Sequence, residues 1–256
     1  MPFTPSHIAA VLPFITVPRL RRWLDPWALA IGTMVPDLPI FLPFLPDYSD
    51  WHSLRGVLTL DLVSVVVLLG VFHAVVREPL IALLPPGLAG RAATLTPSYR
   101  IVPVLLGGVL GSATHVLWDS FTHSHGPAFW GVSWLGASVF GVIRLFRLLQ
   151  YVSSVVGLVL VVWWAVRGLS RLPAVPPPPW LRLPARVRHG VLAACAAASL
   201  LGAVVWPYLY PPAAKFGIAG LITKVGAGTL VGLCLVLACY ATIWQFRRLV
   251  AVFEDA

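Results

Sequence analysis

The sequence has little charge, and its second half has almost no acidic residues. Of the 256 residues, 11% are charged, with 18 Lys and Arg against nine Asp and Glu. A soluble globular domain carries roughly 25% charged residues. With a mean hydropathy of +0.88, the chain has too little polar surface to cover a water-soluble fold. The composition therefore predicts an integral membrane protein and excludes intrinsic disorder.

Cysteine is also scarce, which excludes a disulfide scaffold. The chain has three cysteines, Cys195, Cys234 and Cys239. All three lie inside apolar runs and lack the spacing of metal ligands. We interpret them as small buried side chains.

The basic residues lie mostly between the apolar stretches. A net charge of +9 would suggest nucleic acid in a soluble protein, but Lys and Arg in short loops are typical of the cytoplasmic side of a membrane protein. We therefore expect no nucleic-acid partner. Arginines cluster in residues 77–100, in residues 167–189 and at Arg247 and Arg248. All three groups share one side, predicted to be cytoplasmic, if residues 129–150 do not cross the bilayer.

Five apolar runs are long enough to cross a bilayer, which requires about 20 helical residues. They are residues 54–76, 101–123, 151–169, 190–210 and 217–245. Residues 27–45 contain three prolines and predict a broken helix or a re-entrant piece. Residues 129–143 are shorter and predict an interfacial helix. The expected fold is an all-α, polytopic transmembrane helical bundle with about five to seven spans.

The two halves of the chain differ in chemistry. The proline-rich stretch 173–184 predicts a loop, and residues 120–253 contain no Asp or Glu. Chemistry that needs carboxylates must therefore come from the first half. We predict a membrane-embedded half with a metal site in residues 1–150 and additional transmembrane helices in residues 151–256.

The most informative stretch runs from His115 through Asp119 to His123. Residues four apart share one helix face, so these three side chains form a stripe. A pair of ligands at this spacing is a common way to hold zinc. Interhelical hydrogen bonding would explain the same stripe without a metal. An ionised carboxylate in an apolar helix is costly unless it is paired or metal-bound, which favours the metal.

Further polar residues of the first half can reach this stripe. His52 begins a run that pairs antiparallel with the one ending at His123, which places Asp61 at the depth of His115. Asp61 is then expected to orient His115, although it could instead pair with an arginine or stay protonated. Asp37 lies between two prolines on a bend. His7 follows Ser6, a plausible helix cap, and could equally be an ordinary interfacial histidine.

These residues carry a resemblance to a known group of proteins. The motifs are Phe3-Thr-Pro-Ser-His7, Pro36-Asp37, His52-Ser-Leu and His115-Val-Leu-Trp-Asp119-Ser-Phe-Thr-His123. Together, over about residues 1–125, they resemble an uncharacterised bacterial membrane-protein family related to the membrane-bound, metal-dependent hydrolases. The resemblance implies a metal site formed by His7, Asp37, His52, His115 and Asp119.

The order of ligands is also remotely similar to that of zinc-dependent phospholipase C. In that fold, His and Asp ligands hold zinc ions that activate water against a phosphoester. Carried over, Asp37, His52, His115 and Asp119 form the principal site, and His7 with Asp119 contributes to a second ion. The carboxylate ligands that those enzymes add downstream have no counterpart here, because residues 120–253 contain no Asp or Glu.

The leading hypothesis is an integral membrane, metal-dependent hydrolase that acts on a lipid phosphoester through water activated by Zn²⁺ or another divalent metal. His123 and Asp61 are the expected proton-transfer or orienting groups. One alternative is a membrane enzyme that uses Mg²⁺ and a prenyl diphosphate for lipid transfer or cyclisation. Another is a non-enzymatic protein that handles ions or protons.

The expected partner is membrane lipid, and the sequence leaves the oligomeric state open. The expected location is the bacterial inner membrane, with the site near its extracytoplasmic face.

Overall fold

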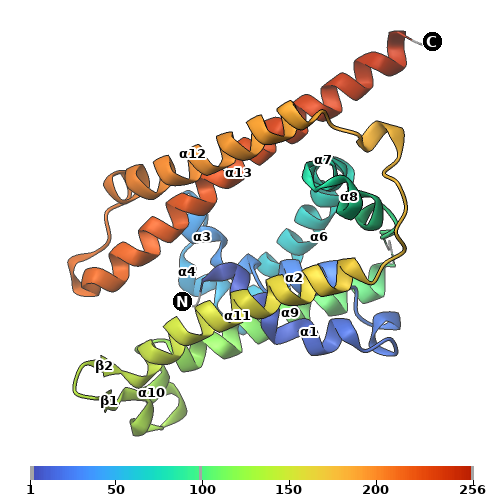
Figure 1. Ribbon diagram of the computed structural model, residues 1–256. Coiled ribbons are helices and arrows are strands. Elements are labelled where there is room, and N and C mark those ends of the chain that lie inside the picture. The colour runs from blue at the N-terminus through green and yellow to red at the C-terminus, as the bar shows by residue number, and fades with distance from the viewer. Residues whose placement is uncertain (1–2, 98–99, 255–256) are drawn as a thin grey trace. The chain divides into compact units, whose positions relative to one another are not determined.

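The protein is almost entirely helical (Figure 1). The computed structural model describes residues 3–97 and 100–254. The elements of the first 97 residues are η1 (Thr4–His7), α1 (Ile8–Thr16), η2 (Leu20–Arg22), α2 (Pro26–Gly32), η3 (Val35–Asp37), α3 (Leu38–Phe41), α4 (Tyr48–Trp51), α5 (Leu54–Gly56), η4 (Val57–Asp61), α6 (Leu62–Val71), η5 (Phe72–Val76), α7 (Arg77–Leu83) and α8 (Pro86–Ala93). After residue 100 follow α9 (Ile101–Thr122), α10 (Gly126–Trp130), η6 (Ser133–Gly136), β1 (Ser138–Val139), β2 (Ile143–Arg144), α11 (Leu145–Ser170), η7 (Pro179–Leu181), α12 (Ala185–Leu209), η8 (Ala214–Phe216) and α13 (Gly217–Glu254).

Within the described residues, five helical segments are long and apolar enough to cross a membrane. They are Leu54–Leu83, Ile101–Thr122, Leu145–Ser170, Ala185–Leu209 and Gly217–Val250. The predicted all-α polytopic fold is therefore confirmed, with the span number at the lower end of the prediction. The protein is a multi-pass membrane protein.

The first span is longer than the apolar run suggested, because it continues through Pro79 to Leu83. Proline lacks an amide hydrogen and usually breaks a helix interior. Here it follows the π-helical turn η5 and is the third residue of α7. The carbonyl oxygen of Val75, four residues earlier, instead accepts a 2.8 Å hydrogen bond from Nε2 of Gln245, so it is not left without a partner. Residues 77–83, which follow the predicted apolar run 54–76, are therefore helical as well.

The chain forms two compact units. The first comprises the described parts of residues 1–69 and 98–166, and the second those of residues 70–97 and 167–256. These units describe packing. The prediction that residues 1–150 carry the site and residues 151–256 add spans concerns roles and stays a prediction.

In the first unit, α2 packs closely on α9. Asp25 begins α2, because its carboxylate accepts hydrogen bonds from the backbone amides of Trp27 and Ala28. Alanine side chains at Gly32 or Gly111 would run into the backbone of the opposite helix. The helix ends at Thr33, and Pro36 then starts the short helix η3. As the prolines of this segment predict, the helix is broken, and the break places Asp37 on a bend.

The prediction of an interfacial helix at residues 129–143 is wrong. This segment contains the last residues of α10, the single turn η6 and a two-stranded hairpin, in which Ser138 pairs with Arg144 and Val139 with Ile143. Gly131 and Gly141 have positive φ angles of 64° and 71°. Such angles interrupt an α-helix and are the natural conformation of glycine in turns.

The second unit is built around the antiparallel pair α12 and α13. Gly202 of α12 faces Gly228 of α13, and a Cβ on either would overlap the backbone of the other helix. Small residues of this kind allow membrane helices to approach closely. In a separate apolar cluster of this unit, Leu181 packs with residues of α7 and α8.

Candidate metal centre

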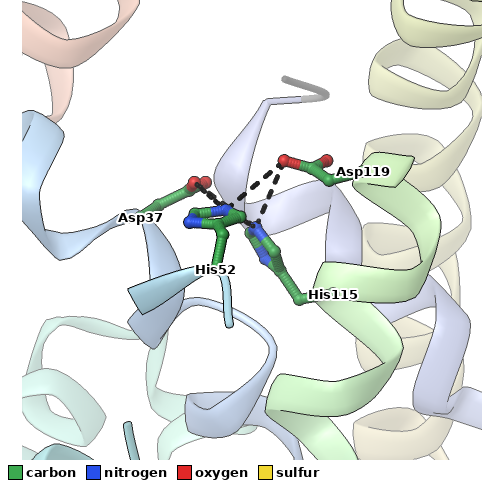
Figure 2. A group of neighbouring side chains, drawn as sticks. All are labelled: Asp37, His52, His115 and Asp119. Atoms are coloured by element: carbon green, nitrogen blue, oxygen red, sulfur yellow. Dashed lines mark hydrogen bonds and ion pairs between the residues drawn. The ribbon is translucent and has the colours of Figure 1, made fainter. Parts of the chain in front are cut away.

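Four side chains of the first unit point toward one another (Figure 2). Asp37 comes from η3, His52 follows α4, and His115 and Asp119 lie one turn apart on α9. All four are buried except His52, which is partly buried. The stripe predicted on α9 thus meets two segments that precede it in the sequence by more than 60 residues. The buried group could hold a metal ion.

Most of the distances within this group are close to those around a tetrahedral ion. Nε2 of His115 lies 3.3 Å from Oδ1 of Asp37, 3.3 Å from Nε2 of His52 and 3.5 Å from Oδ2 of Asp119. Nε2 of His52 lies 3.8 Å from Oδ1 of Asp37 and 3.6 Å from Oδ2 of Asp119. Zinc holds nitrogen and oxygen at about 2.0–2.2 Å, which puts the ligand atoms of a tetrahedral site roughly 3.3–3.6 Å apart. The remaining pair of atoms lies within 4.8 Å.

The backbone fixes how both histidines present their nitrogens. Nδ1 of His115 lies 2.7 Å from the carbonyl oxygen of Thr33, and Nδ1 of His52 lies 3.0 Å from that of Tyr48. A carbonyl oxygen only accepts, so each Nδ1 donates its hydrogen and each neutral ring keeps the lone pair of Nε2 for the centre of the group. Thr33 has this carbonyl available because α2 ends there, and the last carbonyls of a helix lack partners within it.

Hydroxyl groups hold both carboxylates. Thr4 donates a 2.6 Å hydrogen bond from Oγ1 to Oδ2 of Asp37, which leaves Oδ1 facing the histidines. Tyr48 donates from its phenol to Oδ2 of Asp119 at 3.1 Å, and its ring stacks on His52 with centroids 3.7 Å apart. Burial and the charge of Asp119 raise the pKa of Tyr48 well above its usual range. The phenol therefore stays protonated and remains a donor.

Several buried polar atoms converge here without a hydrogen-bond partner among the described residues. They are Oδ1 of Asp37, Oδ1 of Asp119 and both ring nitrogens of His7. A buried polar group without a hydrogen bond is costly, and each case calls for an explanation. A cation bound within the group of four would satisfy Oδ1 of Asp37, whereas Oδ1 of Asp119 faces His7. The residues present therefore fit a divalent metal.

His7 lies beside the group of four. Its Nε2 is 3.4 Å from Oδ1 of Asp119, and its ring stacks on His115 with centroids 3.8 Å apart. Burial, reinforced by the neighbouring His115, lowers the pKa of His7 to about 3. The ring is therefore neutral at physiological pH and carries a free lone pair. It faces the oxygen of Asp119 that points away from the other histidines.

His123 no longer belongs to the helical stripe, because it is the residue after α9 and has an extended backbone. Its ring nonetheless turns back. Nδ1 lies 2.8 Å from the backbone oxygen of Asp119 and 3.7 Å from Oδ2 of the same residue. Burial lowers the pKa of His123 to about 4. The ring is neutral and lies at the rim of the group.

Asp61 is fully buried in the π-helical turn η4. The sequence suggested that its carboxylate orients His115, but the carbonyl of Thr33 occupies Nδ1 of that ring. The carbonyl of Thr33 can take this position because the end of α2 packs directly on α9. Among the described residues, neither carboxylate oxygen of Asp61 has a hydrogen-bond partner. Its part in proton transfer stays a prediction.

Sequence reasoning missed the groups that hold the ligands in place, which are Thr4, Thr33 and Tyr48. Thr4 lies inside the motif that ends at His7, so its position near a ligand could have been noticed. Tyr48 lies between two exposed aspartates, and the segment looks like a solvated loop. The role of Thr33 depends on a backbone carbonyl, for which a side chain gives no signal.

The fold and the site define a class of protein: a multi-pass, helical membrane protein with a buried group of two histidines and two carboxylates that could hold a metal ion. The chain belongs to the family described as a domain of unknown function, DUF4184, which matches residues 1–242. No curated protein and no solved structure matches it.

Proposed function

We propose that the protein is an integral membrane, metal-dependent hydrolase that acts on a lipid phosphoester. The observation that carries the proposal is the convergence of Asp37, His52, His115 and Asp119, whose two histidines, when neutral, direct the lone pair of Nε2 inward. An arrangement fixed in this way by backbone carbonyls is expected where a metal is bound. Hydrogen bonding between helices alone does not require it.

The donor set favours zinc. Two imidazole nitrogens and two carboxylate oxygens suit Zn²⁺, whereas Mg²⁺ prefers oxygen ligands and keeps several waters. The alternative of a Mg²⁺-dependent enzyme acting on a prenyl diphosphate is therefore less well supported. When bound, the ion supplies Lewis acidity, which polarises a phosphoryl oxygen and lowers the pKa of a water molecule.

The remaining residues have roles in handling the proton. In hydrolysis, water adds its oxygen to phosphorus, the bond from phosphorus to the alcohol oxygen breaks, and a proton passes to that alcohol. His123 is neutral and lies at the rim of the group, so it can take the proton from water and return it to the leaving oxygen. Thr4 and Tyr48 hold the carboxylates in place and do not change protonation.

The position of the site along the chain supports a lipid substrate. Asp119 lies one turn before the end of the span Ile101–Thr122, and His52 just before the start of the span Leu54–Leu83. This position along both candidate spans supports a site near a membrane surface, where phosphate head groups are found. At the other end of α9, the amide of Asp25 donates to the carbonyl of Pro103, which brings Arg19, Arg21 and Arg22 to the end near Arg100.

Because basic residues mark the cytoplasmic side, these arginines support an extracytoplasmic site. The membrane we propose is the bacterial inner membrane.

Metal content and lipid hydrolysis, measured on the full-length protein in nanodiscs, test the proposal. We expect about one zinc or more per chain and release of phosphate ester products from bilayer lipid. Both are expected to be lost in His115→Ala and Asp119→Ala. His189→Ala is the control, because this histidine is exposed and belongs to the second unit.

Two results would overturn the proposal. One is purified protein that hydrolyses lipid without any metal. The other is protein that holds zinc stoichiometrically but releases nothing from a panel of lipid phosphoesters. That second result would favour an ion-handling protein without enzymatic activity.

A further inference from the structure

The segment between α9 and α11 presents an unusual apolar surface, which we call the apolar cap. It comprises α10, η6, β1 and β2, that is, residues 126–144. Thr122 ends one span and Leu145 begins the next. Both ends of the cap are thus tied to the same membrane surface, and Figure 1 shows α10 and the hairpin together at one end of α9 and α11.

The apolar cap has a defined internal structure. Leu135 is buried, and the amide of Leu145 donates to the carbonyl of Ala137, which closes the base of the hairpin. The cap is also fastened to α9 beside the metal centre. Trp130 donates from Nε1 to Oγ of Ser120 at 3.0 Å, and its ring stacks on Phe121 with centroids 4.8 Å apart. Ser120 is the neighbour of Asp119, so the cap and the site are joined.

Several large apolar side chains of the cap are exposed. Phe140 is 94% exposed and Val142 is 88% exposed at the tip of the hairpin, and Phe129 and Trp134 are 68% and 59% exposed. Phe140 has a φ of 53°, in the left-handed region that a residue with a side chain adopts at some cost. A hairpin tip in water would favour Asn or Gly at this position.

Charge indicates which surface covers the cap. Residues 120–253 contain no acidic side chain, while Arg144 and Arg147 lie at the base of the hairpin. Aromatic residues flanked by arginine are typical of the interface between lipid head groups and acyl chains. A membrane surface is already present at both ends of the cap, whereas a protein partner would have to be added.

From these observations we propose that the apolar cap is a lipid-docking surface, and that its hairpin tip inserts into the membrane interface beside the metal centre. One consequence rests on the proposed function: the substrate is then a phosphoester embedded in the bilayer, delivered at the edge of the cap, rather than a water-soluble one. The docking itself does not depend on catalysis.

Fluorescence in nanodiscs tests the docking. The three native cysteines are replaced by alanine, and an environment-sensitive fluorophore is attached to Phe140→Cys. The control label is on Ser49→Cys, which is exposed between two aspartates near the same end of the first span. We expect the label on residue 140 to emit at shorter wavelength and to be quenched by lipids with a nitroxide near the head group at least about twofold more strongly than the control.

Emission as in water, without lipid quenching, would overturn the docking. Short-wavelength emission without lipid quenching would overturn it as well, because the cap would then contact protein. A second experiment compares the double variant Phe140→Ser, Val142→Ser with wild type, after confirming that its zinc content is unchanged.

The double variant is expected to lose hydrolysis of bilayer lipid and to keep hydrolysis of bis(p-nitrophenyl) phosphate, a water-soluble phosphodiester. Equal loss of both activities would overturn the consequence for substrate delivery. If the label is quenched by lipid but neither substrate is hydrolysed by wild type, the docking stands and the proposed function fails.

Discussion

Two pairs of helices, α2 with α9 and α12 with α13, both pack closely through glycines, but only the first pair carries the candidate metal site. In both, glycines let the backbones come so close that a single Cβ would overlap the opposite helix. Residues 190–250, which include nearly all of α12 and α13, contain no Asp, Glu or His. In the first pair the close approach brings the carbonyl of Thr33 to His115. Glycines therefore allow close packing in both pairs, but a candidate site forms only in the first pair, where buried polar groups lie at the contact.

From this comparison we expect substitution of the buried carboxylates of the first unit to reduce zinc affinity most. Asp37→Asn keeps the shape of the side chain and removes its charge. Because Asp37 faces both histidines, we expect zinc affinity to fall by about a hundredfold or more. Calorimetric titration of zinc into the chelator-treated protein measures this.

Asp25→Asn is the matched control, since Asp25 is also buried but only caps α2. Asparagine caps helices about as well as aspartate, so zinc affinity should stay at the wild-type value. Equal losses in the two variants would show that Asp37 has a general structural role instead.

Acid should destabilise the first unit through His7. The pKa of His7 is about 3 in the folded protein and 6.5 as the reference value. Between these values the unfolded chain binds a proton that the folded chain does not, so stability falls as the pH falls below about 6.5. At pH 5 the loss from His7 is about 2 kcal/mol.

The measurement is the melting temperature of chelator-treated protein in detergent between pH 7 and pH 5. His7→Gln removes the titrating group, so its melting temperature should depend less on pH than that of wild type. His189→Gln, at the exposed start of α12, should follow wild type. An unchanged slope in His7→Gln would contradict the prediction.

The apolar runs predicted the spans because the thickness of the bilayer fixes helix length, and the spacing from His115 to Asp119 predicted that both face one way. The bend at Asp37 followed from its prolines. The hydrogen bond from His115 to the carbonyl of Thr33 could not be predicted, because it depends on tertiary contact. It forms only because Gly32 and Gly111 let α2 approach α9. The hairpin at residues 138–144 was missed because its strands are only two residues long.

A matched pair of glycine substitutions tests whether only the contact between α2 and α9, and not that between α12 and α13, affects metal binding. Gly111→Ala places a methyl group against the carbonyl of Leu29, and Gly228→Ala places one against that of Gly202. Each overlap costs about 1–3 kcal/mol, partly offset by the better helix propensity of alanine. We expect both variants to melt at lower temperature.

Only Gly111→Ala should also lose zinc affinity, by about tenfold, because it moves α2 and with it the carbonyl that orients His115. Calorimetry on the two variants gives the comparison. A similar loss of affinity in Gly228→Ala would mean that the metal centre depends on the packing of the second unit as well.

The smallest expected effect concerns a hydroxyl outside the group of four. Thr4→Val keeps the shape of the side chain and removes the hydrogen bond to Oδ2 of Asp37, which should lower zinc affinity by roughly three- to tenfold. Thr229→Val in α13 removes a hydroxyl that only bonds to the carbonyl of Val225 in its own helix, so it should leave affinity unchanged. If titration calorimetry finds the same zinc affinity for the two variants, the hydroxyl of Thr4 does not help to hold Asp37, and the bend of the backbone alone does so. The polar groups that matter for zinc binding near the first pair of helices would then be the four ligands only.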